Sequence, residues 1–317
     1  YKRTREGVQG LLDRTCIALY SFLMETAMSP APYILTEPST QTTPVVFSSP
    51  HSGRHYPDAF LSASLLDGRA IRSSEDAFVD ELWSCAPLHG APLIAATMPR
   101  AFIDLNRNSD ELDPALIEGV RHVAHNPRIS SGLGVIPRVV AGGRAIVSGK
   151  MSRSAAEERI QLWWRPYHTC LGQLVEGTIA RFGTALLVDC HSMPREAVEN
   201  HFSAAGRRPD VVLGDRFGSS ADGRLVELVE SLLAAEGLRV LRNMPFAGAY
   251  ITQTYGNPTR NRHVIQIEVD RGLYMNERTL RKSDDYPAFQ TLIDRVAAGI
   301  AAGASDFAGG ERRHAAE

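Results

Sequence analysis

The segment TALLVDCHS, residues 184–192, is the feature that most narrows the folds open to this chain. A near-continuous apolar strand of this kind suits a sheet that is covered on both faces. Further strands are expected at 45–49, 92–97, 210–215, 239–245 and 263–272, with a short extended piece at 101–108. Because strands alternate with helical segments, we predict an α/β fold with a mixed, mostly parallel sheet flanked by helices on both faces.

Helices and loops are expected between these strands. Apolar residues at helical spacing predict a helix that begins near Ser74 and others at 154–182, 222–236 and 287–302. Two β-rich pieces, 135–140 and 145–147, indicate a Gly-rich hairpin inserted as a flap, and FAGAYITQTYG at 246–256 is interpreted as a loop or hairpin.

The domain organisation follows from the same pattern. We predict an N-terminal extension and lead-in at 1–43, a single α/β domain at 44–303 and a flexible tail at 304–317. Residues 1–27 show no recognisable targeting pattern, so we expect them to lie outside the fold.

Composition excludes several classes of protein. A formal net charge of -2 argues against nucleic acid as the main partner. The sequence contains no run of about 18 apolar residues, so no membrane-spanning helix is predicted. The four cysteines show no CxxC spacing, which fits a reduced cytoplasmic protein better than a disulfide scaffold. A small molecule is therefore the expected partner, and the sequence does not predict an oligomeric state.

Two apolar strands each end in a histidine followed by serine, at His51 and His191. Ligands of open α/β sheets bind beyond the carboxyl ends of strands, and two imidazoles delivered there could share a divalent metal. A third, acidic ligand is expected from SSEDAFVDEL, where Glu75, Asp76, Asp80 and Glu81 remain alternatives. The competing interpretation is that each histidine caps its strand and the acidic residues suit a helix N-terminus.

Glu268 stands out in the last strand, HVIQIEVD, because a carboxylate in so apolar a strand is costly to bury without a partner or a task. The functional hypothesis makes Glu268 the general base that activates water and passes its proton to a leaving amine. The alternative is a buried ion pair with Arg262 or Arg271.

The segment RAFIDLNRNSDELDP contributes candidate substrate ligands. Asn106 and Arg107 together suit a substrate carboxylate, and Arg100 is a candidate cation for the oxyanion. Tyr250, from the loop before the last strand, could point toward the substrate. The alternative for the arginines is a surface ion pair with Asp104 or Asp110.

Nine segments in order resemble the N-formylglutamate amidohydrolase family over residues 48–277. They are SSPHSGRHYP, EDAFVDELW, PRAFIDLNRN, GLGVIPR, RPYHTCL, LLVDCHSMP, PDVVLGD, GAYITQTYG and IQIEVDRGLYMNE. The resemblance implies a fold like that of the zinc carboxypeptidases. It also implies zinc-dependent hydrolysis of an N-formyl amide to formate and an amino acid, a reaction of amino-acid degradation.

Carried over to this sequence, the resemblance implies one zinc ion held by His51, Asp76 and His191, with Glu75 or Asp80 as lesser candidates for the acidic ligand. It implies that Glu268 is the catalytic glutamate and that Asn106 and Arg107 bind a substrate carboxylate. EVDRG, at 268–272, departs from members that carry a Gln shortly after this Glu, and so points to a broader branch of the family.

Other functions remain as alternatives. They include a metal-dependent carboxypeptidase or N-acyl amino acid deacylase of another specificity, and a carboxylate-binding module without catalysis. A serine hydrolase that uses Ser52 or Ser192 is disfavoured because no GxSxG motif is present.

Overall fold

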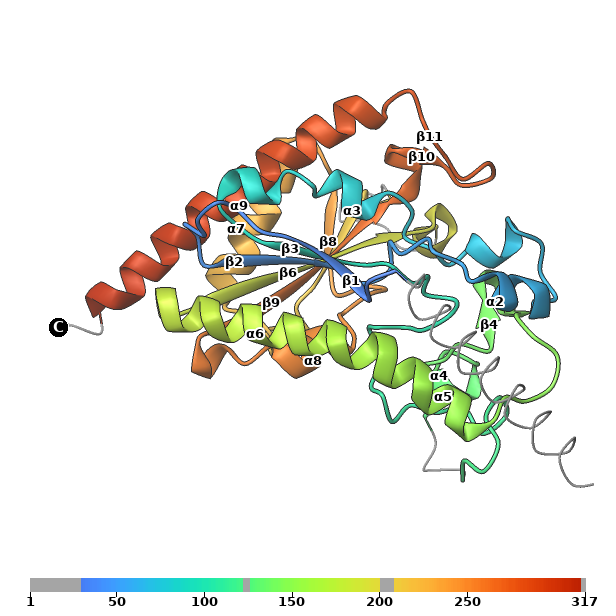
Figure 1. The fold of residues 1–317 in the computed structure, drawn as a ribbon. Coiled ribbons are helices and arrows are strands. Elements are labelled where there is room, and N and C mark those ends of the chain that lie inside the picture. Colours follow the sequence, from blue (N-terminus) through green and yellow to red (C-terminus); the bar gives the residue numbers. More distant parts are fainter. Residues whose placement is uncertain (1–29, 122–125, 200–207, 315–317) are drawn as a thin grey trace, which may run out of the picture. The chain divides into compact units, whose positions relative to one another are not determined.

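The computed structural model of the chain describes residues 30–121, 126–199 and 208–314, and the account below concerns the compact unit Pro32–Glu317. Its centre is a seven-stranded sheet with the order β1-β3-β2-β6-β9-β7-β8 (Figure 1). The strands are β1 Tyr33–Thr36, β2 Val45–Ser49, β3 Leu93–Ala96, β6 Ala185–Met193, β7 Val211–Gly214, β8 Val240–Arg242 and β9 Arg262–Asp270.

The central strands β3, β2, β6 and β9 run parallel to one another, and β8 runs parallel to β7. Two pairs are antiparallel, β1 with β3 and β7 with β9. The prediction of a mixed, mostly parallel sheet is therefore confirmed. Strand β1, which the sequence pattern did not indicate, lies within the segment described as a lead-in and forms the edge of the sheet beside β3.

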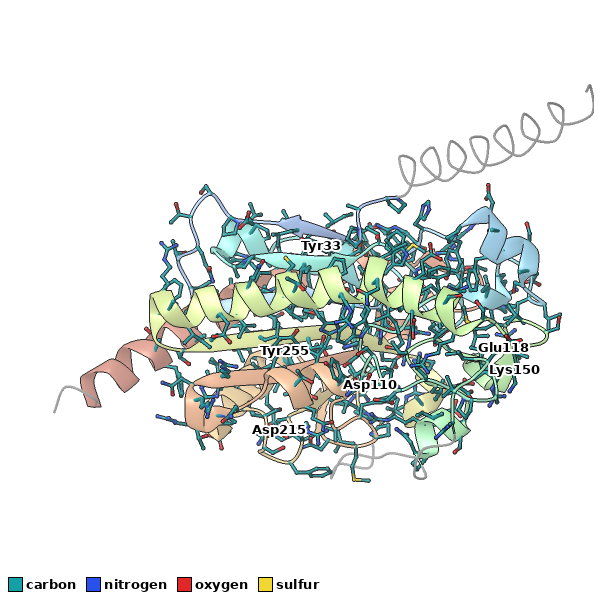
Figure 2. All side chains as sticks on the ribbon, turned by 60° about the horizontal axis from the view of Figure 1, so that its bottom comes forward. Tyr33, Asp110, Glu118, Lys150, Asp215 and Tyr255 are labelled. Carbon is teal, nitrogen blue, oxygen red and sulfur yellow. The ribbon has the colours of Figure 1, made fainter. Side chains whose placement is uncertain are left out.

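Helices cover both faces of this sheet (Figure 1). One apolar cluster joins the sheet to α5 Arg153–Arg159, α6 Arg165–Phe182 and α8 Tyr250–Tyr255. A second cluster on the opposite face joins it to α3 Val79–Leu82, α7 Gly223–Ala235 and α9 Tyr286–His314. Figure 2 draws the side chains and labels Tyr255 of α8. The hydroxyl oxygen of Tyr255 lies 3.0 Å from Nδ1 of His168 on α6.

Shorter elements complete the unit. The helices are α2 Asp58–Ala63, α4 Pro127–Ser130 and the 3-10 helices η1 Ala70–Arg72, η2 Ala86–His89, η3 Ala141–Gly143, η5 Arg195–Val198, η6 Pro258–Arg260 and η7 Arg271–Leu273. The π-helical turn η4 Ile160–Trp164 joins α5 to α6, which confirms the long helix expected at 154–182. Two hairpins are β4 Val139–Val140 with β5 Arg144–Ala145, and β10 Met275–Asn276 with β11 Arg281–Lys282.

Three sequence-based predictions are corrected here. The helix expected from Ser74 is only the single turn α3, because the backbone of Phe78 adopts a left-handed conformation with φ 67° just before it. The extended piece at 101–108 is a set of turns, since the amides of Phe102 and Ile103 both bond back to the Pro99 carbonyl. The expected loop or hairpin around Tyr250 is the helix α8.

The C-terminal helix is also longer than predicted. Helix α9 ends at His314 rather than Ala302, so the segment expected to form a flexible tail is largely helical. Its small residues permit close packing against α7: a Cβ atom on Gly303 would lie 2.5 Å from a methyl carbon of Leu228. No described helix combines the length and apolarity needed to cross a membrane.

The two faces of the central strands differ in polarity toward their carboxyl ends. Strand β6 alternates so that Leu187, Asp189 and His191 share the face covered by α6, while Leu186, Val188 and Cys190 pack toward α7 and α9. The register pairs His191 with Glu268 of β9. Paired residues of neighbouring strands share a face, so the sheet itself places an imidazole beside a carboxyl group.

Candidate active site

His51 lies in the turn that follows β2 and is almost fully buried, with 2% of its surface exposed. The turn is held by a hydrogen bond from the Asp76 amide to the His51 carbonyl, at 3.0 Å. Gly53 continues the turn against the backbone of the segment after β3, where an added Cβ would lie 2.0 Å from the Met98 carbonyl oxygen. This contact requires glycine, and it holds the backbone two residues after His51 against the segment that follows β3.

We therefore expect Gly53→Ala to destabilise the fold by roughly 1–3 kcal/mol, the usual cost of overpacking a close backbone contact. Thermal unfolding would measure this change. Gly68→Ala is the matched control, because a Cβ at Gly68 meets no atom within 4 Å. An equal effect of the two substitutions would contradict the role assigned to Gly53.

The structure brings His51, Asp76 and His191 together. Their ligand atoms all lie within 4.8 Å of one another, and the two imidazole ring centroids are 4.8 Å apart. Asp76 Oδ2 lies 3.0 Å from Nδ1 of His191 and 3.6 Å from Nδ1 of His51. All three side chains are buried, so these residues form a closed group that could hold a metal ion.

The far side of each imidazole meets a second carboxylate. His51 Nε2 lies 2.7 Å from Asp104, and His191 Nε2 lies 3.0 Å from Asp189. Metal-binding histidines commonly donate their second ring N–H to a carboxylate in this way, which orients the other nitrogen toward the metal. His51 Nδ1 is buried without a hydrogen-bond partner among the described residues. Both observations fit a cation between the Nδ1 atoms and Asp76.

Electrostatics supports the same arrangement. Burial would raise the pKa of Asp76, but the hydrogen bond with His191, the nearby His51 ring and the charge of Arg271 hold this pKa well below its ordinary value. For His191, burial opposes protonation, yet the neighbouring Asp189 and Asp76 raise its pKa well above the ordinary value. The group is thus rich in negative charge, and a bound cation would replace the proton of His191.

Arg271 supports Asp76 from behind. Its Nη2 donates to Asp76 Oδ1 at 2.9 Å, and its Nε donates to the Ser192 hydroxyl at 3.1 Å. Arg271 begins the turn after β9 and is buried. The guanidinium therefore directs the other carboxylate oxygen of Asp76 toward the histidines.

Glu268 lies on the strand beside His191 and is 8% exposed. Burial raises the pKa of Glu268 to about 7, and the neighbouring His191 counteracts part of this shift. Gln266 Nε2 donates to Glu268 Oε1 at 2.9 Å, and neither Arg262 nor Arg271 pairs with Glu268. Arg262 pairs instead with Glu176. A carboxyl group that titrates near neutrality beside the imidazole of His191 is suited to general acid–base chemistry.

Arg100 and Arg107 both approach Asp104, at 3.0 Å and 4.0 Å from their Nε atoms. Burial would raise the pKa of Asp104, but the charges of Arg100, His51 and Arg107 hold it well below its ordinary value. Arg100 uses only its Nε in a hydrogen bond to a described residue, which leaves both terminal nitrogens. Arg107 is 7% exposed, and burial lowers its pKa.

Asn106 is enclosed by protein. Its Nδ2 lies 3.1 Å from His191 Nε2 and 3.3 Å from Asp189, and its Oδ1 accepts the amide of Ile251 at the start of α8. Asn106 therefore connects the His191–Asp189 pair to α8. The neighbouring Tyr250 is half-buried and lines a cavity of about 1640 Å³ together with Asn108 and Gln253.

The comparisons with known proteins bear on what this group does. A model of the N-formylglutamate amidohydrolase family matches residues 43–275. The chain belongs to the N-formylglutamate amidohydrolase family. It is 33% identical over 240 residues to N-formylglutamate deformylase of Pseudomonas aeruginosa, covering 74% of this chain and 83% of the relative. It is 30% identical over 270 residues to the deformylase of Pseudomonas putida, covering 83% and 95%.

A solved structure agrees with this family. The crystal structure of N-formylglutamate amidohydrolase from Ralstonia eutropha JMP134 is similar with a TM-score of 0.80 and 36% identity, covering 86% of this chain and 98% of that one. The resemblance seen in the nine sequence segments is thus confirmed, as is the assignment to hydrolases of amide C–N bonds.

The other acidic candidates in this amidohydrolase lie elsewhere. Glu75 pairs with Arg72 at 2.9 Å and accepts the Tyr56 hydroxyl at 3.0 Å. Asp80 pairs with Arg54 at 3.0 Å. Glu81 pairs with Arg54 and Lys282. Of these acidic alternatives, the structure therefore groups only Asp76 with the two histidines.

Three residues that contact the group were not named as site residues from the sequence: Asp104, Asp189 and Arg271. Asp104 and Arg271 entered only as partners of possible ion pairs, and Asp189 not at all. One signal was available for Asp189, because it lies two residues before His191 on the same face of a strand that is otherwise apolar there. No comparable signal existed for Asp104 and Arg271, whose partners lie far away in the chain.

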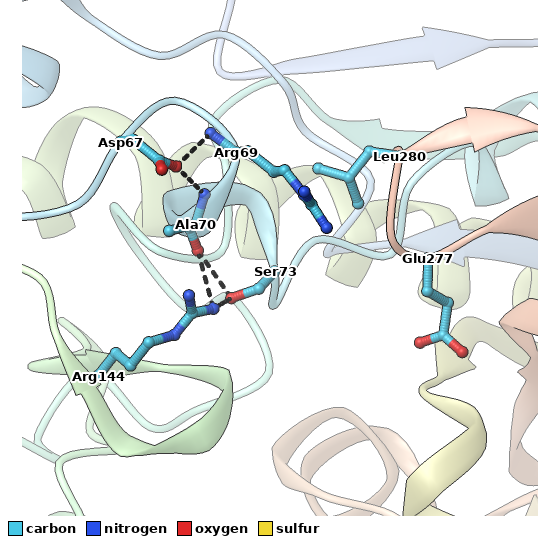
Figure 3. Close-up of a pocket in the computed structure, with 7 residues that line it drawn as sticks. All are labelled: Asp67, Arg69, Ala70, Ser73, Arg144, Glu277 and Leu280. Carbon is cyan, nitrogen blue, oxygen red and sulfur yellow. Dashed lines mark hydrogen bonds between the residues drawn. The ribbon is translucent and has the colours of Figure 1, made fainter.

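Two smaller cavities share Ser73 and the flap residue Arg144 in their lining. One of about 320 Å³ is lined by the flap residue Arg144, together with Arg69, Ser73 and Glu277 (Figure 3). The Arg144 guanidinium donates to the Ser73 hydroxyl at 2.9 Å, and the Ser73 carbonyl accepts from Arg271. The flap is thus tied, through one serine, to the guanidinium that supports Asp76. A second cavity, of about 550 Å³, is lined by Arg271 itself.

The Asp189 contact leads to a direct prediction. Asp189→Asn should weaken metal binding by roughly 10- to 100-fold, because an amide cannot orient the His191 ring as a carboxylate does. Titration with a competing chelator would measure the change. Asp215→Asn, a buried carboxylate that bonds Asn243 away from the group, is the control. Unchanged affinity in Asp189→Asn would show that the carboxylate does not support the histidine.

Proposed function

We propose that this chain is a zinc-dependent deformylase that hydrolyses N-formyl-L-glutamate, or a related N-acyl amino acid, to formate and the free amino acid. The observation that carries the proposal is the pairing of the buried His51–Asp76–His191 group with Glu268 on the adjacent strand. The names of the Pseudomonas relatives, both N-formylglutamate deformylases, support the choice of substrate.

The metal would be held by His51 Nδ1, His191 Nδ1 and Asp76 Oδ2. Two imidazoles and one carboxylate form a ligand set that suits a catalytic zinc, with further positions left for water and substrate. When bound, such a cation acts as a Lewis acid that lowers the pKa of water and polarises a carbonyl group. Asp104, Asp189 and Arg271 would hold the three ligands in place.

Glu268 would act as the proton carrier. Its carboxylate takes a proton from the attacking water, whose oxygen then bonds to the formyl carbon. The C–N bond breaks next, and the same proton passes from Glu268 to the amine that leaves. The pKa near 7 suits both transfers at neutral pH, since the group can accept and donate without a large free-energy difference.

The two arginines would have separate roles. Arg100, with both terminal nitrogens available, would stabilise the negative charge that develops on the formyl oxygen. Arg107 would bind a substrate carboxylate, because its buried charge lies no closer than 4.0 Å to Asp104 and its Nη2 bonds to no described residue. Asn106 uses its amide within the protein, so we assign to it the positioning of His191 rather than a contact with substrate.

Tyr250 lies at the first position of α8, next to Ile251, whose amide bonds Asn106. Its ring contacts those of Trp164 and His168, with centroids 5.7 Å and 5.3 Å away. We propose that Tyr250 forms an apolar side of the substrate site, beside the large cavity that it lines.

Arg107→Ala should raise KM for an acidic N-formyl amino acid by roughly tenfold to a hundredfold, the value of one or two charged hydrogen bonds. The effect on kcat should be smaller, since the carboxylate contact forms before the reaction begins. Steady-state kinetics would separate the two. Arg295→Ala, at an exposed residue of α9 that pairs with Glu236 on the opposite face of the sheet, serves as the control. A normal KM in Arg107→Ala would reject the carboxylate contact.

Formate release from purified protein tests the function itself. N-formyl-L-glutamate should be hydrolysed faster than N-formyl-L-leucine, and chelation should abolish both reactions until zinc is restored. Preference for N-acetyl over N-formyl substrates would indicate a deacylase of another specificity. Binding without hydrolysis, with zinc present, would indicate a carboxylate-binding protein, and activity that survives chelation would reject the metal.

A further inference from the structure

A second group of possible metal ligands lies on the other face of the sheet. Cys85 and His89 belong to the segment around η2, and Asp294 belongs to α9, which packs against it. The ligand atoms of Cys85, His89 and Asp294 all lie within 4.8 Å of one another. His89 Nε2 is 2.7 Å from Asp294 Oδ1.

The chemistry of these three atoms is specific. A thiolate sulfur, an imidazole nitrogen and a carboxylate oxygen are together preferred by zinc and similar borderline-soft divalent ions, and not by magnesium or calcium. The three side chains are partly exposed, so an ion can reach them from solvent. We propose that Cys85, His89 and Asp294 form a second divalent-cation site of the zinc class.

The thiol is what separates this proposal from a simpler interpretation. A histidine hydrogen-bonded to an aspartate would by itself join η2 to α9 without any metal. Cys85 adds a third ligand. Its sulfur makes a long contact of 4.0 Å with the Leu82 carbonyl, and burial together with the neighbouring Asp294 carboxylate raises the pKa of the thiol. A divalent cation would take the place of the thiol proton between Cys85 and Asp294.

Metal binding here would cross-link two separate parts of the chain. The Cys85 S–H bond breaks, a sulfur–metal bond forms, and the proton leaves to solvent. Because Asp294 lies on α9 and the other two ligands lie around η2, a bound ion would connect these elements and stabilise the folded chain by mass action. This effect is independent of the proposed deformylase activity.

Cobalt(II) alone is a suitable probe, because cobalt bound to a thiolate gives a near-ultraviolet charge-transfer absorption. The His51–Asp76–His191 group contains no thiol, so the band reports only the second site. We expect the full chain to develop this absorption as Co²⁺ is added, and Zn²⁺ to remove it. Cys85→Ser should abolish the band, while Cys170→Ser, which changes a cysteine on the opposite face, should retain it.

Asp294→Asn should weaken Co²⁺ binding by roughly 10- to 100-fold or more. Loss of a residue that only supports a ligand already costs this much, and Asp294 is proposed to bind the ion directly. A measurement without any variant adds a second test: Zn²⁺ should protect Cys85 from alkylation by iodoacetamide, as located by mass spectrometry. A wild-type chain without the charge-transfer band, a band retained in Cys85→Ser, or alkylation of Cys85 that Zn²⁺ does not slow would each overturn the site. Loss of deformylase activity would leave all three readouts unaffected.

Discussion

Replacing Glu268 by glutamine should lower kcat by about 10²-fold or more while the protein keeps its metal. The amide preserves the shape of the side chain and its place beside His191, but it cannot accept a proton from water. Formate release and metal analysis of the same preparation would measure both quantities. Glu176→Gln, at an exposed glutamate on α6, is the matched control. Turnover near the wild-type value in Glu268→Gln would remove Glu268 from the mechanism.

The pH dependence should identify the same group. With a pKa of about 7, Glu268 is protonated in acid and becomes an active base as the pH rises. We therefore expect kcat/KM of the wild-type enzyme to increase with pH through about 7. The residual activity of Glu268→Gln should lack this limb of the profile.

The free energy of unfolding should respond to pH in the opposite direction to activity, and decrease as the pH rises. A carboxyl group whose pKa is higher in the folded state than in the unfolded state makes folding less favourable as the pH rises above the unfolded value. With chelator present, Glu268→Gln should therefore be more stable than the wild type at pH 8, by about 3 kcal/mol from the shift of 4.5 to about 7. Chemical denaturation at pH 5 and pH 8 would show whether the difference grows with pH.

His191→Ala should lose the metal and, with it, at least about 10²-fold in turnover, since a bound cation contributes several kcal/mol of transition-state stabilisation. The substitution removes one of three ligands and leaves Asp189 and Asp76 without their shared partner. Metal analysis after dialysis would measure the first effect, and formate release would measure the second.

The control for this variant is His55→Ala, which changes an exposed histidine in the turn that also contains His51. It should keep both the metal and the activity. Metal bound by His191→Ala with wild-type affinity would contradict the ligand set. Loss of activity without loss of metal would show that His191 contributes to catalysis but does not bind the metal.

The central strands and the meeting of two histidines could be predicted because both depend on local sequence. Short, largely apolar segments indicate buried strands, and parallel neighbours bring their carboxyl ends to one edge. The ring centroids of His51 and His191 are indeed 4.8 Å apart. Asp76 was the favoured acidic ligand only through the family resemblance, since four carboxylates within seven residues fit the pattern equally well.

The supporting residues could not be predicted because they depend on contacts between distant parts of the chain. Asp104 meets His51 across 53 residues, and Arg271 meets Asp76 across 195. The helix errors have a different cause. Phe78 interrupts a regular apolar pattern by a left-handed backbone, which periodicity does not reveal. The glycines of α9 are weak helix formers, and the close packing of Gly299 and Gly303 against α7 is not visible in the sequence.

The pairing of His191 with Glu268 has a consequence for how relatives could diverge. Side-by-side strands are held about 4.8 Å apart by their ladder of backbone hydrogen bonds, so the gap between the proposed ligand and the proposed base is a property of the scaffold. Insertions or deletions in the surrounding loops leave that gap unchanged. Substitutions in the flap and the surrounding turns could therefore change substrate preference without changing the spacing of His191 and Glu268.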